Sequence, residues 1–199
     1  MEDSNLASMS SEERAFYYWL LEAKEQGLIL DFEHQPKSFE LSQKETIKQL
    51  KPMKRVDDKI LDAHLLNPHK YTADYKICFT EKALPFLVDT YDMIRQNSKV
   101  SILVNSDLVA YVDTKGGFNA HGSLREFSIN QKWVYSIHRV FINKITMSTC
   151  RKSFLGKTWT PEDVRCDLVR TKSQKIYKKL HFKRKKIAEY LAEKTREKV

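Results

Sequence analysis

The stretch from residue 100 to residue 113 limits the possible folds of this chain more than any other. Its sequence, VSILVNSDLVAYVD, is dominated by β-branched and aliphatic side chains. The polar triplet Asn105-Ser106-Asp107 separates two apolar runs and is typical of a turn. We therefore expect two strands that turn back on each other, so the rest of the chain has to extend or cover a sheet.

Helical and strand-like patterns alternate along the rest of the chain. Ser10 and Glu13 have the S-x-x-E spacing of a capping box, and Gly27 stands where the helix would end. Two further helices are expected at residues 86–95 and 128–137. Strand patterns cover residues 28–35, 39–41, 71–79 and 139–145. This order predicts an α/β (α+β) fold in which helices flank a central mixed β-sheet.

The chain has 199 residues, which is enough for one domain with a proper core, and its 41% hydrophobic content excludes a wholly disordered protein. We expect a domain at residues 1–170 whose core spans about residues 10–145. Two insertions are predicted within it, at about residues 43–70 and 80–98. The first is rich in lysine and is expected to be partly helical around residues 59–66.

The net charge of +9 is concentrated at one end of the chain. Residues 171–199 hold 11 Lys and Arg against 3 Asp and Glu, a net charge of +8. We expect a basic helical tail here, with Ile176, Leu180, Ile187 and Leu191 on one face. Such a tail favours a polyanionic partner, nucleic acid before membrane, although a solvated basic helix is an ordinary alternative. The candidate DNA contacts are Lys172, Lys175, Lys178, Lys179, Lys183, Arg184, Lys185 and Lys186.

Several classes of protein are excluded by what the sequence lacks. No apolar run approaches the ~20 residues that span a bilayer. The three cysteines form no CxxC pair and the first residues are acidic rather than typical of a signal peptide, so a cytoplasmic location is expected. Gly156-Lys157-Thr158 imitates the end of a P-loop, but Arg151 stands where that motif needs glycine.

A spaced set of carboxylates with a lysine is the strongest candidate for a reactive site. Asp113 ends an apolar strand pattern, Lys115 follows two positions later, and a Gly-Gly pair comes next. Residues two apart in a strand share a face, so this carboxylate and ammonium should lie side by side. Together with Asp74 and the backbone carbonyl of Thr114, Asp113 offers the oxygen ligands that Mg²⁺ prefers. An ordinary ion pair is the alternative, because the D/E-x-K pattern occurs four times in this charged chain.

These residues also resemble the motifs of a known superfamily. The chain resembles small phage endonucleases and junction resolvases of the PD-(D/E)XK, restriction-endonuclease-like superfamily over about residues 10–145. The resemblance runs through the following segments: Glu13-Arg14-Ala15-Phe16-Tyr17, Glu33-His34-Gln35-Pro36, Tyr71-Thr72-Ala73-Asp74-Tyr75, Val112-Asp113-Thr114-Lys115-Gly116 and Lys132.

The resemblance implies a restriction-endonuclease-like core and a Mg²⁺- or Mn²⁺-dependent DNA endonuclease, with selectivity for branched DNA such as a Holliday junction as one variant. In this interpretation Asp74 and Asp113 bind the metal, Lys115 is the catalytic lysine, and Glu13 is the helical acid. Glu12 takes that last place if the helix register differs. Supporting roles would fall to Gln35 and Lys132.

The same resemblance implies a homodimer in the cytoplasm of a bacterial host, if the chain is phage-encoded. Two positions depart from the superfamily pattern: Ala73 replaces the usual proline, and the second acid is Asp113 rather than the commoner Glu. These departures leave one alternative, a catalytically inactive protein of the same fold that binds nucleic acid or a host protein.

Overall fold

The computed structural model describes residues 8–52, 59–91, 102–116, 121–148, 152–164, 169–170, 175–176 and 182–196. Its centre is a four-stranded mixed sheet in the order β1-β6-β9-β10. β6 is antiparallel to both of its neighbours, β1 and β9, whereas β10 is parallel to β9. Their bounds are Ile29–His34 for β1, Tyr75–Phe79 for β6, Val109–Gly116 for β9 and Ile142–Met147 for β10. The predicted α+β class with a mixed sheet is confirmed at this level.

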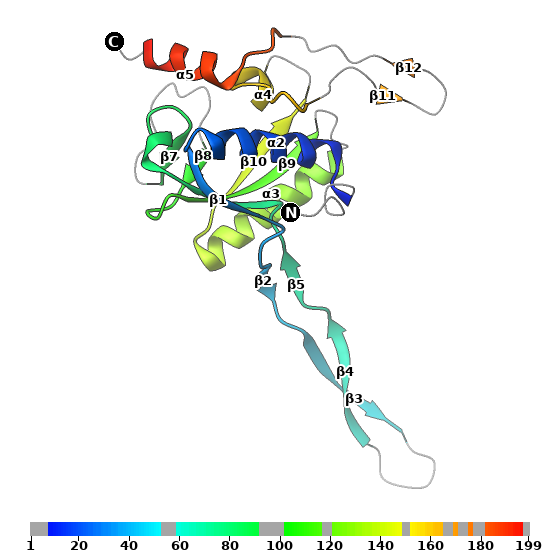
Figure 1. Ribbon diagram of the computed structural model, residues 1–199. Helices are drawn as coiled ribbons and strands as arrows, with labels where there is room; N and C mark the ends of the chain where they lie inside the picture. The colour runs from blue at the N-terminus through cyan, green and yellow to red at the C-terminus, as the bar shows by residue number, and fades with distance from the viewer. Residues whose placement is uncertain are drawn as a thin grey trace.

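Helices cover both faces of this sheet (Figure 1). The alternation of side chains along β9 shows which helix covers which face, because successive residues of a strand point in opposite directions. Val112 is buried in the same apolar cluster as helix α2 (Ser11–Glu25). Its neighbour Tyr111 packs instead with the cluster that contains Val134 of helix α3 (His121–His138). The sheet is therefore the middle layer of three.

The capping box predicted at the start of α2 is confirmed. The Glu13 backbone N–H donates to Ser10 Oγ at 3.2 Å, and the Ser10 backbone N–H donates to the Glu13 carboxylate at 2.9 Å. Gly27 follows the helix at a φ of 68°, which a side chain would make unfavourable. The buried face of α2 includes Trp19, whose ring stacks on Trp159 with centroids 4.3 Å apart.

The C-terminal segment packs on the domain instead of standing apart from it. Helix α4 (Phe154–Lys157) and helix α5 (Ile187–Arg196) both contribute to the main core. Tyr190 of α5 is fully buried, and its hydroxyl donates to the Phe86 carbonyl at 3.2 Å. The prediction of one continuous tail helix is wrong, because Ile176 lies in the short strand β12 (Lys175–Ile176), paired with β11 (Val169–Arg170). Leu180 lies outside the described residues.

The predicted helix at residues 59–66 is also wrong. This segment is strand β4 (Lys59–Leu66), which pairs with β3 (Glu45–Lys51) in an antiparallel ribbon. Strands β2 (Phe39–Ser42) and β5 (His69–Tyr71) form the base of that ribbon. The apolar positions of KILDAHLL fit a helix as well as a strand, and only the pairing with β3 decides between them.

The turn predicted at residues 105–107 is confirmed. The Asn105 side chain accepts hydrogen bonds from the backbone N–H groups of Asp107 and Val109, at 3.1 and 2.8 Å, and β8 (Ile102–Val104) leads into it. The helix predicted at 86–95 is wrong over residues 88–90. Strand β7 (Val88–Thr90) lies there, parallel to β8, after the 3-10 turn Glu81–Ala83. Residues 92–95 lie outside the described part. No helix within the described residues is long and apolar enough to cross a membrane.

Candidate active site

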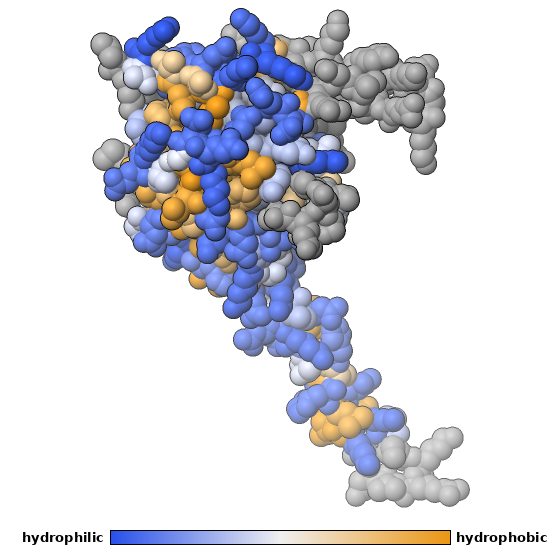
Figure 2. Space-filling view, in the orientation of Figure 1, coloured by the Kyte–Doolittle hydropathy of each residue, from blue (hydrophilic) through white to orange (hydrophobic). Residues whose placement is uncertain are grey.

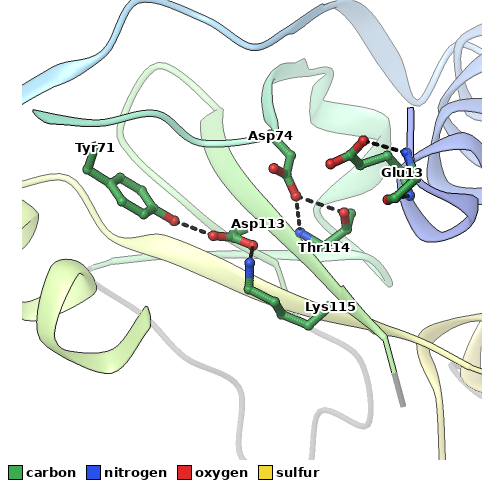
Figure 3. A network of polar contacts seen from close by, with 7 residues as sticks. Glu13, Tyr71, Asp74, Asp113, Thr114 and Lys115 are labelled. Atoms are coloured by element: carbon green, nitrogen blue, oxygen red, sulfur yellow. Dashed lines mark hydrogen bonds and ion pairs between the residues drawn. The ribbon is translucent and has the colours of Figure 1, made fainter. Parts of the chain in front are cut away.

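Asp74 and Asp113 are brought together by the register of two neighbouring strands. Tyr75, the first residue of β6, pairs with Val112 of β9. Because these strands are antiparallel, the next step along each places Asp74 beside Asp113. Figure 3 shows the two carboxylates at this end of the β6–β9 pair, with Glu13 on the side of Asp74 away from Asp113. Two carboxylates that are 39 positions apart in sequence therefore share one site.

Asp74 is held in place by Thr114, the residue that follows Asp113 on β9. Its Oδ2 accepts two hydrogen bonds from Thr114, from the backbone N–H at 2.6 Å and from the hydroxyl at 2.7 Å. Burial raises the pKa of Asp74, and the charge of Asp113 raises it further, while the Thr114 bonds act in the opposite direction. No hydrogen bond from the described residues reaches its Oδ1. Asp74 is therefore an oriented carboxylate with one oxygen left to bind a cation.

Asp113 is buried, with 4% of its surface exposed. One oxygen accepts a hydrogen bond from the Tyr71 hydroxyl, and the other forms an ion pair with the Lys115 ammonium group. Burial, followed by the negative charge of Asp113, raises the pKa of Tyr71, so its hydroxyl remains a donor at neutral pH. The predicted contact between Asp113 and Lys115 on one face of the strand is present.

Lys115 lies between the carboxylate pair and helix α3. Its side chain is 26% exposed, and its ammonium nitrogen is 5.8 Å from the centre of the Phe127 ring. The lysine is thus partly sheltered and partly open to solvent. A charged group in that position can reach a ligand that approaches Asp113 from outside.

The two glutamates at the start of α2 both lie near the carboxylate pair, and each has a different neighbour there. The Glu13 carboxylate accepts the hydrogen bond of the capping box, and its charge contributes to the raised pKa of Asp74. Glu12 lies against the end of β9: a methyl group added at Gly116 would come within 2.8 Å of Glu12 Oε1. The choice between Glu12 and Glu13 as the helical acid therefore stays open.

The two supporting residues lie in different places. The Gln35 backbone N–H donates to the Asp74 carbonyl at 2.8 Å, so this residue adjoins the site, at a φ of 49°. Lys132 is exposed on α3 and lines a groove with Tyr135 and Phe141. Among the described residues, no hydrogen bond or ion pair joins Lys132 to the carboxylates, so it lies outside their cluster.

Most of the tail cations that the structure describes are engaged within the chain. Arg184 donates to the Val164 carbonyl at 3.1 Å, Lys185 pairs with Glu193, and Lys186 lies 3.3 Å from Glu162. These contacts dock the tail on the domain, and Lys183 is exposed beside them. Of the other predicted DNA contacts, only the backbone of Lys175 is described, in β12; outside the described residues lie Lys172, Lys178 and Lys179.

The carboxylate pair has the donor chemistry for a hard divalent cation. Within the described residues, no group of three or more His, Cys, Asp or Glu side chains is arranged to hold a metal ion. Mg²⁺ is commonly bound through one or two carboxylates, with water and substrate phosphate completing its shell. The uncommitted Oδ1 of Asp74 and the mutual repulsion of the two carboxylates fit such an ion.

Comparison of the chain with protein-family models, with curated proteins and with solved structures finds no match. The resemblance to PD-(D/E)XK endonucleases therefore stays a prediction, and the site has to be judged by its own geometry. That geometry adds two contacts that the sequence did not indicate, the Tyr71 hydroxyl on Asp113 and the Thr114 hydroxyl on Asp74. No spacing rule signals either, because both depend on how β5, β6 and β9 are aligned.

Proposed function

We propose that this protein is a metal-dependent DNA endonuclease that hydrolyses phosphodiester bonds. The observation that carries the proposal is the arrangement of Asp74 and Asp113, which lie side by side where β6 begins against β9, with Lys115 forming an ion pair with Asp113. Such a set offers oxygen ligands for a divalent ion beside a cation for a phosphate. The α+β fold with a central mixed sheet agrees with the expected restriction-endonuclease-like core.

Each residue of the site has a distinct part in this proposal. Asp74 and Asp113 would hold Mg²⁺ or Mn²⁺, assisted by the Thr114 carbonyl and by Glu13 or Glu12. The ion would supply charge stabilisation to the phosphate and increase the acidity of a water molecule. Lys115 would orient that water and balance the charge that develops on the phosphate oxygens. Tyr71 and Thr114 keep the two carboxylates in their orientations.

The binding of DNA in this proposal depends on positively charged side chains. DNA would be bound through phosphate contacts from cations of the tail, of which Lys183 is exposed, so affinity should fall as salt rises. The cleavage assay below compares linear with four-way DNA and so tests for selectivity toward branched DNA. The location expected for such an enzyme is the cytoplasm.

The direct test is cleavage of plasmid, linear and four-way DNA with Mg²⁺ or Mn²⁺. We expect nicking by the wild-type protein and its loss, by at least about 100-fold, in Asp113→Ala and in the isosteric Asp113→Asn, because an essential ligand is removed. Asp31→Asn is the matched control: Asp31 also pairs with a lysine, Lys24 at 2.8 Å, but on the exposed surface of β1. Full cleavage by both Asp113 variants would refute the assignment.

A second measurement separates catalysis from binding. The alternative of an inactive nucleic-acid-binding protein is favoured by one observation, that Tyr71 and Lys115 already occupy both oxygens of Asp113. If that alternative holds, the wild-type protein binds DNA without cutting it, and the Asp113 variants bind equally well. A rise in melting temperature on adding Mg²⁺, present in the wild type and absent in Asp113→Asn, would support the metal site independently of activity.

A further inference from the structure

The β3–β4 ribbon leaves the rest of the molecule as a long arm (Figure 1). Every residue of β3 is exposed, and so is every residue of β4 except Ala63. The two strands form a sheet of their own, and no third strand pairs with either among the described residues. An isolated two-stranded ribbon is only marginally stable in water. The described part of the chain therefore leaves both faces of the arm without a covering layer.

The arm exposes large apolar side chains to solvent (Figure 2). In an antiparallel pair, directly opposite residues point to the same face, so the regular register from Thr46 to Lys51 assigns the side chains of that stretch. Glu45 lies before a register shift, and it shares a face with Ile47 because the two are two positions apart on β3. One face, which we call the Ile47 face, combines Ile47 with Ala63 and Leu61 with Gln49. Ile47 is 51% exposed and Leu61 is 45% exposed. Ile47, Ala63 and Leu61 adjoin one another and form the apolar centre of this face, beside the polar Gln49.

The opposite face is interrupted by charge. Lys48 and Asp62 face each other there and form an ion pair at 2.6 Å. This pair separates Leu50 and Ile60, near the tip, from the base of the arm. The Ile47 face is thus the better docking surface, because its apolar centre is not divided.

The ends of the Ile47 face carry opposite charges. Glu45 lies at the base end, while Lys51 and Lys59 lie opposite each other at the tip end. A polyanion laid along this face would meet the tip lysines favourably and Glu45 unfavourably. A second arm that runs the other way would match both ends, because each glutamate would meet a lysine.

We propose that the arm is a dimerisation ribbon, in which the Ile47 faces of two copies of this chain stack antiparallel about a twofold axis. The axis passes close to Lys48 and Asp62, the middle pair of the ladder. Glu45 of each copy then lies against Lys51 of the other, and the Ile47 and Leu61 side chains form the shared apolar centre. A twofold contact of one surface with itself is the commonest way in which soluble proteins form dimers.

The size of the contact sets the expected strength. One ribbon face is at the small end of specific interfaces, so the dimer should dissociate at concentrations of roughly micromolar. The proposal is independent of the nuclease activity: it concerns association of the free protein, measured without DNA and without metal. Failure of one proposal would leave the other unaffected.

Sedimentation equilibrium of the full chain is the first test, with a matched pair of variants. Leu61→Asp places a charge in the Ile47 face and should weaken the dimer by at least tenfold. Ile60→Asp introduces the same charge one residue away, on the opposite face, where Ile60 is 68% exposed. It should leave the association constant unchanged. Equal effects of the two variants would overturn the assignment of the face.

A charge exchange tests the twofold arrangement itself. Glu45→Lys and Lys51→Glu should each weaken association, whereas the double variant should restore it. Six steps along the strand separate Glu45 from Lys51, roughly 20 Å, so rescue cannot arise within one chain. Circular dichroism would confirm that each variant is folded. A wild-type protein that stays monomeric at about 100 µM, or a double variant without rescue, would overturn the proposal.

Discussion

Two antiparallel ladders of this protein have the same hydrogen-bond pattern and opposite surroundings. β6 and β9 lie inside the central sheet, where α2 covers one face and α3 the other. β3 and β4 lie in the arm, where neither face is covered by the described part of the chain. In the inner ladder of β6 and β9, β6 alternates buried and half-buried residues, while β3 in the arm is exposed throughout. Strand pairing alone therefore says little about how much a ladder stabilises the fold.

The difference also explains where a demanding polar site can be placed. Asp74 and Asp113 are forced close together at the end of the inner ladder, against their mutual repulsion. That arrangement persists because the surrounding core holds β6 and β9 in register. The arm has no comparable core, so it is suited to association rather than to the exact placement of reactive groups. Three changes test this contrast.

The largest effect is expected from the core that supports the inner ladder. Trp19→Ala removes a fully buried ring that stacks on Trp159 and donates to Thr158 Oγ1 at 3.2 Å. It should lower the free energy of unfolding by about 3–5 kcal/mol, measured by urea denaturation. Trp133→Ala is the control, since Trp133 is 38% exposed and, among the described residues, its ring stacks on His69 alone. A loss as large in the control would contradict the contrast.

An intermediate effect, of opposite sign, is expected at the site. Asp74→Asn removes a buried negative charge and, with it, the repulsion from Asp113, while its side-chain oxygen can still accept the Thr114 bonds. It should raise the unfolding free energy by about 1 kcal/mol at neutral pH in EDTA, and it should abolish cleavage.

The pH dependence of that gain has a defined direction. Because the folded-state pKa of Asp74 is raised, wild-type stability falls as pH rises from the unfolded pKa of about 4 through the folded pKa. The advantage of Asp74→Asn should therefore vanish at acidic pH and be complete at neutral pH. Asp31→Asn should show no such gain, since Lys24 lowers the pKa of Asp31. Thermal denaturation over a pH series measures this gain. A gain that does not grow with pH would contradict the explanation.

The smallest effect is expected from the arm. Replacing residues 45–66 by a short Asn-Gly turn removes a ladder that packs on nothing in the described domain. The unfolding free energy of the monomer should change by less than about 0.5 kcal/mol, measured in dilute solution where dimers dissociate. A loss comparable with that of Trp19→Ala would mean that the arm is part of the folding unit.

Local patterns predicted local structure well. The capping box of Ser10 and Glu13, the turn at Asn105 and the shared face of Asp113 and Lys115 all depend on spacings of two to four residues. Hydrogen-bond reach and the two-residue period of a strand decide such features, so the sequence contains them directly. The segment at 59–66 was predicted wrongly because its apolar spacing suits two structures, and its partner strand lies elsewhere in the chain.

The sequence by itself determined that a carboxylate and a lysine share one strand face, and that most of the net charge lies in the last 29 residues. Only the tertiary structure decided that Asp74 and Tyr71 meet Asp113, and that Arg184, Lys185 and Lys186 bind within the chain. The physical reason is range. Side-chain direction follows from the local backbone period, whereas strand register and burial depend on packing among segments far apart in the chain.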